Sequence, residues 1–306
     1  MEKVLVIVGP TAVGKTALSV DLAANWQGEI INGDSMQVYK KLDIGTAKAT
    51  KEEQRDIPHH LIDILDPIAD YTVSDFQKAA RKKITEITQR GHLPIVVGGT
   101  GLYIQALLYN FQLGGEEKVP KEKRMEIEKF ALERGNQALW QRLYEQDPRT
   151  AETIHPNNQQ RVIRALEVVE YTGKSFQQKE AIKPLYEAKI VALNTERELL
   201  YQRINQRVDL MMAQGLLEEA RFVHSLGEVQ SARGIGYKEF APYFEGNGTL
   251  EAVVEKVKQD SRRYAKRQLT WFRNRMQCDW YDLVQNDEQR QQLEMDIQHW
   301  LGGRIE

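Results

Sequence analysis

Eight residues near the amino terminus have the types and the spacing of a phosphate-binding loop. They read GPTAVGKT and match the pattern G-x-x-x-x-G-K-[ST]. Their members are Gly9, Pro10, Thr11, Ala12, Val13, Gly14, Lys15 and Thr16. The run VLVIV directly before them predicts a buried strand, and KTALSVDLAA predicts the helix that follows. This context argues against the alternative, a chance match in an ordinary glycine turn.

The chemistry of such a loop is the binding of a dense anion. A glycine turn between a strand and a helix directs several amide N–H groups and the helix dipole at one point, which favours a polyphosphate. Lys15 would add a positive charge at the outer phosphate. The Thr16 hydroxyl would hold a Mg²⁺ that bridges phosphate oxygens. The sequence therefore predicts a phosphate site with Mg²⁺ as its cofactor.

A second group of polar residues follows the short strand predicted at residues 29–32. Asp34 comes just after this strand, and Gln37 lies three residues further on. A carboxylate close to a bound diphosphate experiences like-charge repulsion, which raises its pKa and its readiness to accept a proton. The Gln37 amide carries both a donor and an acceptor, as an adenine edge does. Asp34 also has alternative roles, as an outer group around Mg²⁺ or as a helix cap.

The strand predicted at residues 93–97 ends in Gly98, Gly99 and Thr100. Nucleotide hydrolases with a phosphate-binding loop normally have an acid at such a place, where it holds Mg²⁺. Asp63, in the segment LIDIL, is an alternative acid. The Thr100 hydroxyl and its two glycines suit a diphosphate oxygen. The alternative reading of these three residues is a turn with a helix cap.

Strands and helices alternate in the first third of the chain. Residues 74–90 have helical apolar spacing, with Ser74 as the expected N-cap and Gly91 as the stop. Strands separated by helices of this length predict an α/β fold with a doubly wound parallel sheet, like that of the P-loop NTPases. Ligands of such sheets bind beyond the carboxyl ends of the strands. The phosphate loop, Asp34 and Thr100 should therefore converge on one crevice.

The pattern changes near residue 114. Residues 116–134 are helix formers and charges, and helical signals continue to about residue 173. Strand character returns at residues 189–193, and helices follow from Arg197 on. We therefore expect a helical insertion at residues 115–186. The α/β core would consist of residues 1–114 and 187–306.

Length, charge and cysteine content indicate which classes of protein and partner are compatible with the sequence. The chain has 306 residues and a formal net charge of −2, which does not by itself suggest a nucleic-acid partner. Residues 261–275, however, contain six Lys or Arg, no acid, and three interleaved aromatic residues. This pattern fits either an RNA-binding surface or a solvated helix face whose aromatic residues belong to the core. The single cysteine, Cys278, fits a reducing cytoplasm. The first apolar run is too short for a signal peptide or a membrane span, so no membrane partner is expected.

Six sequence blocks together resemble the bacterial tRNA dimethylallyltransferases, also called tRNA isopentenyltransferases. They occur in the family's order across nearly the whole chain. The blocks are GPTAVGKT at 9–16, DSMQVYKKLDIGTAK at 34–48, VGGTGLY at 97–103, HPNNQQRVIRALEV at 155–168, RGIGYKE at 233–239 and KRQLTWFR at 266–273. The resemblance implies transfer of a dimethylallyl group from dimethylallyl diphosphate to N6 of adenine 37 in tRNA. The phosphate loop would then hold a diphosphate leaving group.

The resemblance also assigns site residues. Asp34 is implied as the base, and Thr100, Lys15 and Arg207 are implied as groups that stabilise the departing diphosphate, with Arg203 one helical turn away from Arg207. The resemblance implies that the insertion at 115–186 contacts tRNA. Binding of the tRNA anticodon stem-loop is implied for three segments and two single residues. They comprise Asp34, Ser35, Met36, Gln37, Thr100, Arg124, Gln160, Arg161, Val162, Ile163, Arg164, Arg233, Gly234, Ile235, Gly236, Tyr237 and Lys238. A cytoplasmic monomer is expected.

Two other classes of protein remain as alternatives at this stage. The phosphate loop alone would favour a small-molecule kinase that uses ATP. A regulatory nucleotide-binding module without chemistry is the third class. Transfer of label from dimethylallyl diphosphate to tRNA in the absence of ATP distinguishes a dimethylallyltransferase from both of these alternatives.

Overall fold

The computed structural model describes residues 1–110, 119–173, 175–176 and 183–302. The chain forms two compact units, one of Met1–Tyr109 with Pro184–Glu306 and one of Asn110–Lys183. The smaller unit therefore begins and ends within a few residues of the insertion boundaries expected at 115 and 186. Among the described residues, no helix is long and apolar enough to cross a membrane.

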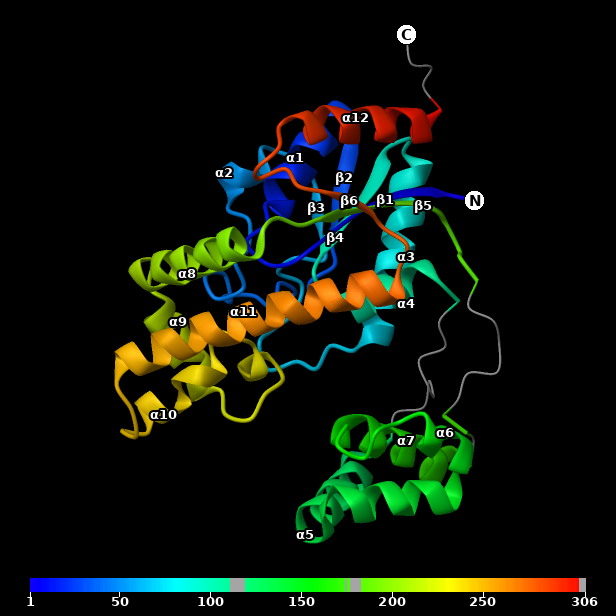
Figure 1. Ribbon diagram of the computed structural model, residues 1–306, viewed down its shortest axis with the longest axis vertical. Coiled ribbons are helices and arrows are strands. Elements are labelled where there is room, and N and C mark those ends of the chain that lie inside the picture. Colours follow the sequence, from blue (N-terminus) through cyan, green and yellow to red (C-terminus); the bar gives the residue numbers. More distant parts are fainter. Residues whose placement is uncertain (111–118, 174, 177–182, 303–306) are drawn as a thin grey trace. The chain divides into compact units, whose positions relative to one another are not determined.

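A six-stranded parallel sheet forms the centre of the larger unit (Figure 1). The strand order is β3-β2-β4-β1-β5-β6, so β1 lies between β4 and β5. The strands are β1 Lys3–Val8, β2 Gly28–Asn32, β3 His59–His60, β4 Leu93–Gly98, β5 Glu187–Leu193 and β6 Asp279–Tyr281. The strands expected at 29–32, 93–97 and 189–193 are confirmed. The short edge strands β3 and β6 were not expected from the sequence.

Helices cover both faces of this sheet. The helices of the larger unit are α1 Lys15–Asn25, α2 Lys51–Gln54, α3 Val73–Gln89, α4 Gly101–Leu108, α8 Arg197–Ala213, α9 Leu216–Ser225, α10 Ala241–Phe244, α11 Leu250–Arg275 and α12 Glu288–Leu301, with the 3₁₀ turns η1 Ser231–Arg233 and η2 Lys238–Phe240. The predicted doubly wound fold is therefore confirmed.

The pleat of β1 divides its side chains between two hydrophobic cores. Val4, Val6 and Val8 are fully buried in the core that contains residues of α3, α4, α9 and α11. Leu5 and Ile7 are fully buried in the other core, with residues of α1, α8 and α12. Successive side chains of a strand point to opposite faces, so a strand buried on both sides reads as a continuous apolar run.

The helix expected at 74–90 begins one residue earlier than predicted, and its cap is a different residue. Thr72, not Ser74, is the N-cap of α3: its side chain accepts from the Asp75 N–H, and Asp75 bonds back to the Thr72 backbone. This reciprocal capping box satisfies two amide groups at the helix start, which Ser74 inside the first turn cannot do. The predicted stop is confirmed, because Gly91 follows the helix end with φ +77°.

The smaller unit is helical, with α5 Lys121–Gln146, α6 Pro148–Glu152 and α7 Gln159–Thr172. Gly135 interrupts α5 with φ 81° and ψ 171°, which is a non-helical conformation. The helix expected at 116–134 begins only at Lys121, because residues 119–120 are not helical; residues 116–118 lie outside the described residues. The unit has its own core, which contains Leu139, Leu143 and Leu166.

Candidate active site

A cavity of about 380 Å³ opens in the larger unit, next to the carboxyl ends of β1, β2 and β4. The phosphate loop, the segment after β2, the end of β4 and the helices α8 and α11 all contribute to its walls. Its lining includes Thr11, Lys15, Thr16, Asp34, Ser35, Met36, Gln37, Gly45, Thr46, Ala47, Val97, Gly98, Gly99, Arg207, Arg233, Gly234, Ile235, Gly236, Tyr237, Lys238, Tyr264, Arg267 and Gln268. The phosphate loop and Asp34 therefore meet at one cavity as expected, but Thr100 is not among the residues that line it.

The phosphate loop (residues 9–16) turns sharply between β1 and α1. Gly9 has φ +143°, and a Cβ there would lie 2.6 Å from the carbonyl oxygen of Leu193 on the neighbouring strand, so only glycine fits. The Lys15 ammonium folds back onto the loop, donating to the carbonyls of Gly9 (3.0 Å) and Pro10 (2.7 Å). Burial and the charge of Arg207 lower the pKa of Lys15 to about 7, while Asp34 opposes the shift. An anion in the cavity would favour the charged form.

Two arginines of α8 contact the phosphate loop. Arg203 Nε donates to the carbonyl of Ala12 at 2.9 Å, so Arg203 is paired with the loop backbone. Arg207 lines the cavity, and its Nη1 lies 3.4 Å from the Thr11 hydroxyl. Burial and the nearby Arg203 charge lower the pKa of Arg207. Arg207 is thus placed to face an anion in the loop.

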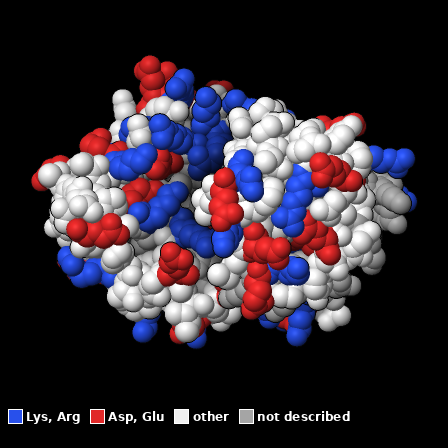
Figure 2. Space-filling model, turned by 90° about the horizontal axis from the view of Figure 1, so that it is seen from below, with Lys and Arg blue, Asp and Glu red and all other residues white. Residues whose placement is uncertain are grey.

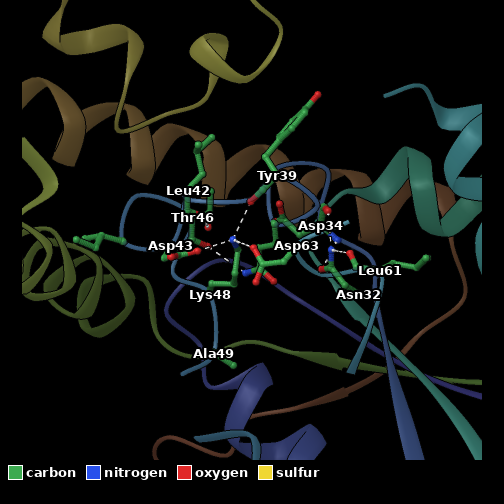
Figure 3. A network of polar contacts seen from close by, with 12 residues as sticks. Asn32, Asp34, Tyr39, Leu42, Asp43, Thr46, Lys48, Ala49, Leu61 and Asp63 are labelled. Atoms are coloured by element: carbon green, nitrogen blue, oxygen red, sulfur yellow. Dashed lines mark hydrogen bonds and ion pairs between the residues drawn. The ribbon is translucent and has the colours of Figure 1, made fainter. Parts of the chain in front are cut away.

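Asp34 lies just beyond β2 in a partly buried turn. The Asn32 side chain fixes this turn: its Nδ2 donates to the carbonyls of Asp34 and Leu61, both at 3.0 Å, and its Oδ1 accepts from the Asp34 N–H (Figure 3). Burial raises the pKa of Asp34, although the Met36 N–H and the charge of Lys15 act in the opposite direction. The direction agrees with the expectation for a base, but the cause is burial rather than repulsion by an anion.

Thr100 occupies the N-cap position of α4, but its side chain makes no cap hydrogen bond. Its Oγ1 accepts instead from the Ser35 N–H at 3.2 Å. The hydroxyl therefore joins the segment after β4 to the segment that carries Asp34. This contact disfavours the simpler reading of Thr100 as a helix cap.

Gln268, on α11, is a site residue that the motif analysis missed. It is 5% exposed, and its amide bridges the two loops of the cavity. Its Oε1 accepts from the Thr11 N–H at 3.0 Å, and its Nε2 donates to the Gly99 carbonyl at 3.0 Å. A sequence signal existed: the buried residues Ala265 and Phe272 lie three before and four after it on the same helix face. A glutamine on such a face requires buried hydrogen-bond partners.

The segment Arg233 to Lys238 closes another side of the cavity. Arg233 and Lys238 are exposed, whereas Tyr237 is 3% exposed. Gly236 has φ +94°, and a Cβ on Gly234 would lie 2.7 Å from the Met36 methyl group, so the two glycines permit close approach to the rest of the wall. The segment therefore offers charge to a ligand at both ends and a buried tyrosine between them.

Helix α11 carries the basic stretch 261–275. Arg263, Lys266, Arg267 and Arg273 are exposed, while Phe272 is fully buried and belongs to the core. Of its aromatic residues, only Tyr264 lines the cavity. Figure 2 shows one face of the molecule, on which Lys and Arg side chains (blue) and Asp and Glu side chains (red) are both present. The exposed charges and the buried Phe272 fit the solvated helix face, and RNA binding by this stretch stays a prediction.

The expected tRNA contacts of the insertion lie on or near α7. Arg161 and Gln160 are exposed there. Arg124, on α5, donates to Gln160 (3.0 Å) and to Glu167 (3.2 Å), and Arg164 also pairs with Glu167 at 3.0 Å. The remaining two of the expected set, Val162 and Ile163, are at most 1% exposed and form part of the core of the unit. Their side chains are therefore structural, because helical spacing turns them away from the exposed face.

The oxygen ligands at the cavity could hold Mg²⁺ only together with a bound anion. Thr16 supplies one exposed hydroxyl at the cavity, and hard oxygen donors are what Mg²⁺ prefers. Across the part of the chain that the structure describes, no group of three or more His, Cys, Asp or Glu is arranged to hold a metal. Mg²⁺ commonly keeps several waters and binds through substrate phosphates. The residues present therefore fit an ion that arrives with a diphosphate.

Comparison with known proteins identifies the family. The sequence model of the family described as IPP transferase matches residues 37–275. The tRNA dimethylallyltransferase of Enterococcus faecalis is 58% identical over 98% of both chains. That of Geobacillus kaustophilus is 51% identical over 100% of this chain and 98% of its own.

Solved structures agree. The tRNA isopentenylpyrophosphate transferase of Bacillus halodurans is 48% identical, with a TM-score of 0.75 over 99% of this chain and 97% of its own. A eukaryotic dimethylallyltransferase, described as acting on tRNA, has a TM-score of 0.83 and 32% identity over 100% of this chain and 81% of its own. On sequence and on fold alike, this chain belongs to the IPP transferase family.

Proposed function

We propose that this chain transfers a dimethylallyl group from dimethylallyl diphosphate to N6 of adenine 37 in tRNA and releases diphosphate. The observation that carries the proposal is that a carboxylate with a raised pKa and an anion-binding loop line the same cavity. Asp34 and Lys15 both face it and interact electrostatically with one another. Family membership supplies the class of reaction.

Different residues of the cavity assist the two halves of the reaction, the departure of diphosphate and the attack by adenine. The bond between C1 of the dimethylallyl group and the diphosphate oxygen breaks, and its electron pair leaves with the diphosphate. The amide groups of the phosphate loop, Lys15 and Arg207 stabilise the charge that develops there. N6 of adenine forms the new bond to C1, and its proton passes to the Asp34 carboxylate. Thr100 holds the turn that carries Asp34, through its contact with Ser35.

Mg²⁺ is proposed as the cofactor, held by the Thr16 hydroxyl together with diphosphate oxygens. When bound, it supplies further stabilisation of charge on the leaving diphosphate. The hydroxyl of Thr16 lies at the first turn of α1, beside the Lys15 that faces the same anion.

The anticodon stem-loop of tRNA is the proposed form of the second substrate. Adenine must leave its stack to enter a cavity of this size, as in other enzymes that act on a base. The exposed cations Arg233, Lys238 and Arg267 lie at the cavity and suit the RNA backbone. A monomer is proposed as the acting form, because the phosphate loop, Asp34 and Arg207 meet at one cavity within a single chain. The single cysteine supports the cytoplasm as the place of action.

Incubation with labelled dimethylallyl diphosphate and unmodified tRNA, without ATP, tests the proposal. We expect label in the RNA for the wild type. Asp34→Asn should keep tRNA and diphosphate affinity but lose about 10²- to 10⁴-fold in turnover, which is the usual contribution of a general base. Full turnover in this variant would remove Asp34 from the reaction, and no labelled RNA with the wild type would refute the proposed function.

A further inference from the structure

One wall of the cavity is a loop, residues 43–48, that lies beside Gln37. Gly45, Thr46 and Ala47 of this cavity loop line the cavity together with Gln37 and Asp34. Ala47 has φ 50°, a left-handed conformation that is unusual for a residue with a Cβ. Such a conformation persists only where the surroundings hold it in place. The contacts of the cavity loop show two clamps that do so.

The first clamp is Glu219, in the first turn of α9. Its carboxylate accepts hydrogen bonds from three consecutive amide N–H groups, those of Asp43 (2.8 Å), Ile44 (2.9 Å) and Gly45 (2.7 Å). It also accepts from the Tyr237 hydroxyl at 2.8 Å. Four donors use the full acceptor capacity of a carboxylate. Gly45 has no room for a side chain, because a Cβ would lie 2.7 Å from the Tyr237 ring.

The second clamp is Lys48, whose side chain is only 4% exposed. Its ammonium donates to the Tyr39 carbonyl at 2.8 Å and pairs with the carboxylates of Asp43 and Asp63, each at 2.6 Å (Figure 3). In the same view, Lys48 lies at the centre of these three partners. The far end of the cavity loop is therefore tied to the segments that flank Asp34 and β3.

Between the two clamps, the cavity loop fixes the orientation of the Gln37 amide. Gln37 Nε2 donates to the carbonyls of Thr46 (3.0 Å) and Ala47 (3.3 Å). A carbonyl oxygen can only accept, so the nitrogen of the amide must face the loop. Gln37 lines the cavity, and within the described part of the chain its amide oxygen accepts no hydrogen bond, so this oxygen remains available to a ligand.

We propose that Glu219 and Lys48 are positioning residues, which hold the cavity loop so that Gln37 offers only a hydrogen-bond acceptor to the base in the cavity. This arrangement selects a purine with a donor at position 6, namely the exocyclic amine of adenine. A carbonyl at that position would face the Gln37 oxygen, and an unsubstituted purine would leave the oxygen without a partner. The inference rests on the proposed function, since it requires that a purine enters this cavity.

Three stem-loop RNAs that differ only at position 37 test the inference. They carry adenine, unsubstituted purine or hypoxanthine, and the Kd of each is measured for the full-length chain. We expect the wild type to bind the adenine RNA about tenfold more tightly than either of the others, because a site built around one hydrogen bond penalises a ligand that lacks it. Gln37→Met should reduce this ratio to about one.

Glu219→Gln and Lys48→Met should reduce the same ratio to about one, and adding either change to Gln37→Met should have no further effect. The matched controls are Glu218→Gln and Lys40→Met, which change exposed neighbours of the same types. A merely structural role would weaken all three RNAs equally and would also weaken binding of inorganic diphosphate. A positioning role lowers only the preference for adenine RNA and leaves the Kd for inorganic diphosphate unchanged.

Two results would overturn the inference: a wild-type ratio in Gln37→Met, or a wild-type ratio in both clamp variants. If Glu219→Gln fails to fold, Lys48→Met and Gln37→Met decide the question. Lys48→Met releases the other end of the cavity loop, and Gln37→Met removes the amide itself. Transfer of label to adenine RNA by the wild type is measured in the same preparation. If the wild type transfers no label, the proposed function is rejected. If it transfers label but the variants named above keep the wild-type affinity ratio, only this inference is rejected.

Discussion

Substitution of Gln268 by leucine removes both hydrogen bonds that join α11 to the two loops of the cavity. The Thr11 N–H and the Gly99 carbonyl lose their partners, which lie at 3.0 Å in each case. A buried backbone group without a partner costs about 1–3 kcal/mol. Thr11 lines the cavity, where water can reach its N–H, so its cost should fall at the lower end. We therefore expect a loss of about 2–4 kcal/mol in the free energy of unfolding.

Thermal unfolding and titration with diphosphate measure the two consequences. A loss of this size lowers the Tm by about 5–10 °C in a domain of this length. The diphosphate Kd should also rise, because Gln268 no longer holds the phosphate loop against the end of β4. Gln259→Leu, at an exposed position of the same helix, is the control and should change stability by less than about 0.5 kcal/mol.

A Tm and a diphosphate Kd equal to those of the wild type would refute this reasoning. They would mean that water or a rearranged loop replaces both hydrogen bonds without cost. Gln268→Glu separates the two bonds, because it keeps an acceptor for Thr11 but places a second acceptor against the Gly99 carbonyl. We expect it to be at least as destabilising as the leucine variant.

Three further outcomes follow from individual contacts. Gly99→Ala should reproduce the Gln268→Leu phenotype in thermal unfolding, since its Cβ would lie 1.9 Å from Gln268 Nε2. Burial acts to raise the pKa of Glu29, but hydrogen bonds from Arg90, His60 and His92 outweigh it and lower the pKa from 4.5 to about 2. This carboxylate should therefore contribute about 3 kcal/mol of stability above pH 4.5, lost as the pH falls towards 2, and urea unfolding of Glu29→Gln should lack this pH dependence. Arg161→Gln should weaken tRNA binding and reduce the slope of log K against log salt by about one, and an unchanged slope would exclude a phosphate contact there.

Local sequence was sufficient for the elements that carry the chemistry. The phosphate loop, the strands that precede Asp34 and Gly98, and the helix after the loop all depend on residues that are neighbours along the chain. Their apolar runs and glycines specify strand, turn and helix directly, and the parallel topology then brings their ends together. The position of Asp34 beside Lys15 therefore required no knowledge of the rest of the molecule.

Tertiary structure alone decided which residues hold that chemistry in place. Gln268 reaches Thr11 across 257 residues of sequence, and Glu219 reaches Asp43 across 176. No local spacing encodes such a contact, because it exists only after the sheet has brought α9 and α11 against the loops. The same holds for Val162, which lies in a segment expected to bind RNA but packs into the core of the smaller unit. Side-chain type and period are properties of a segment, whereas partners and burial are properties of the packed fold.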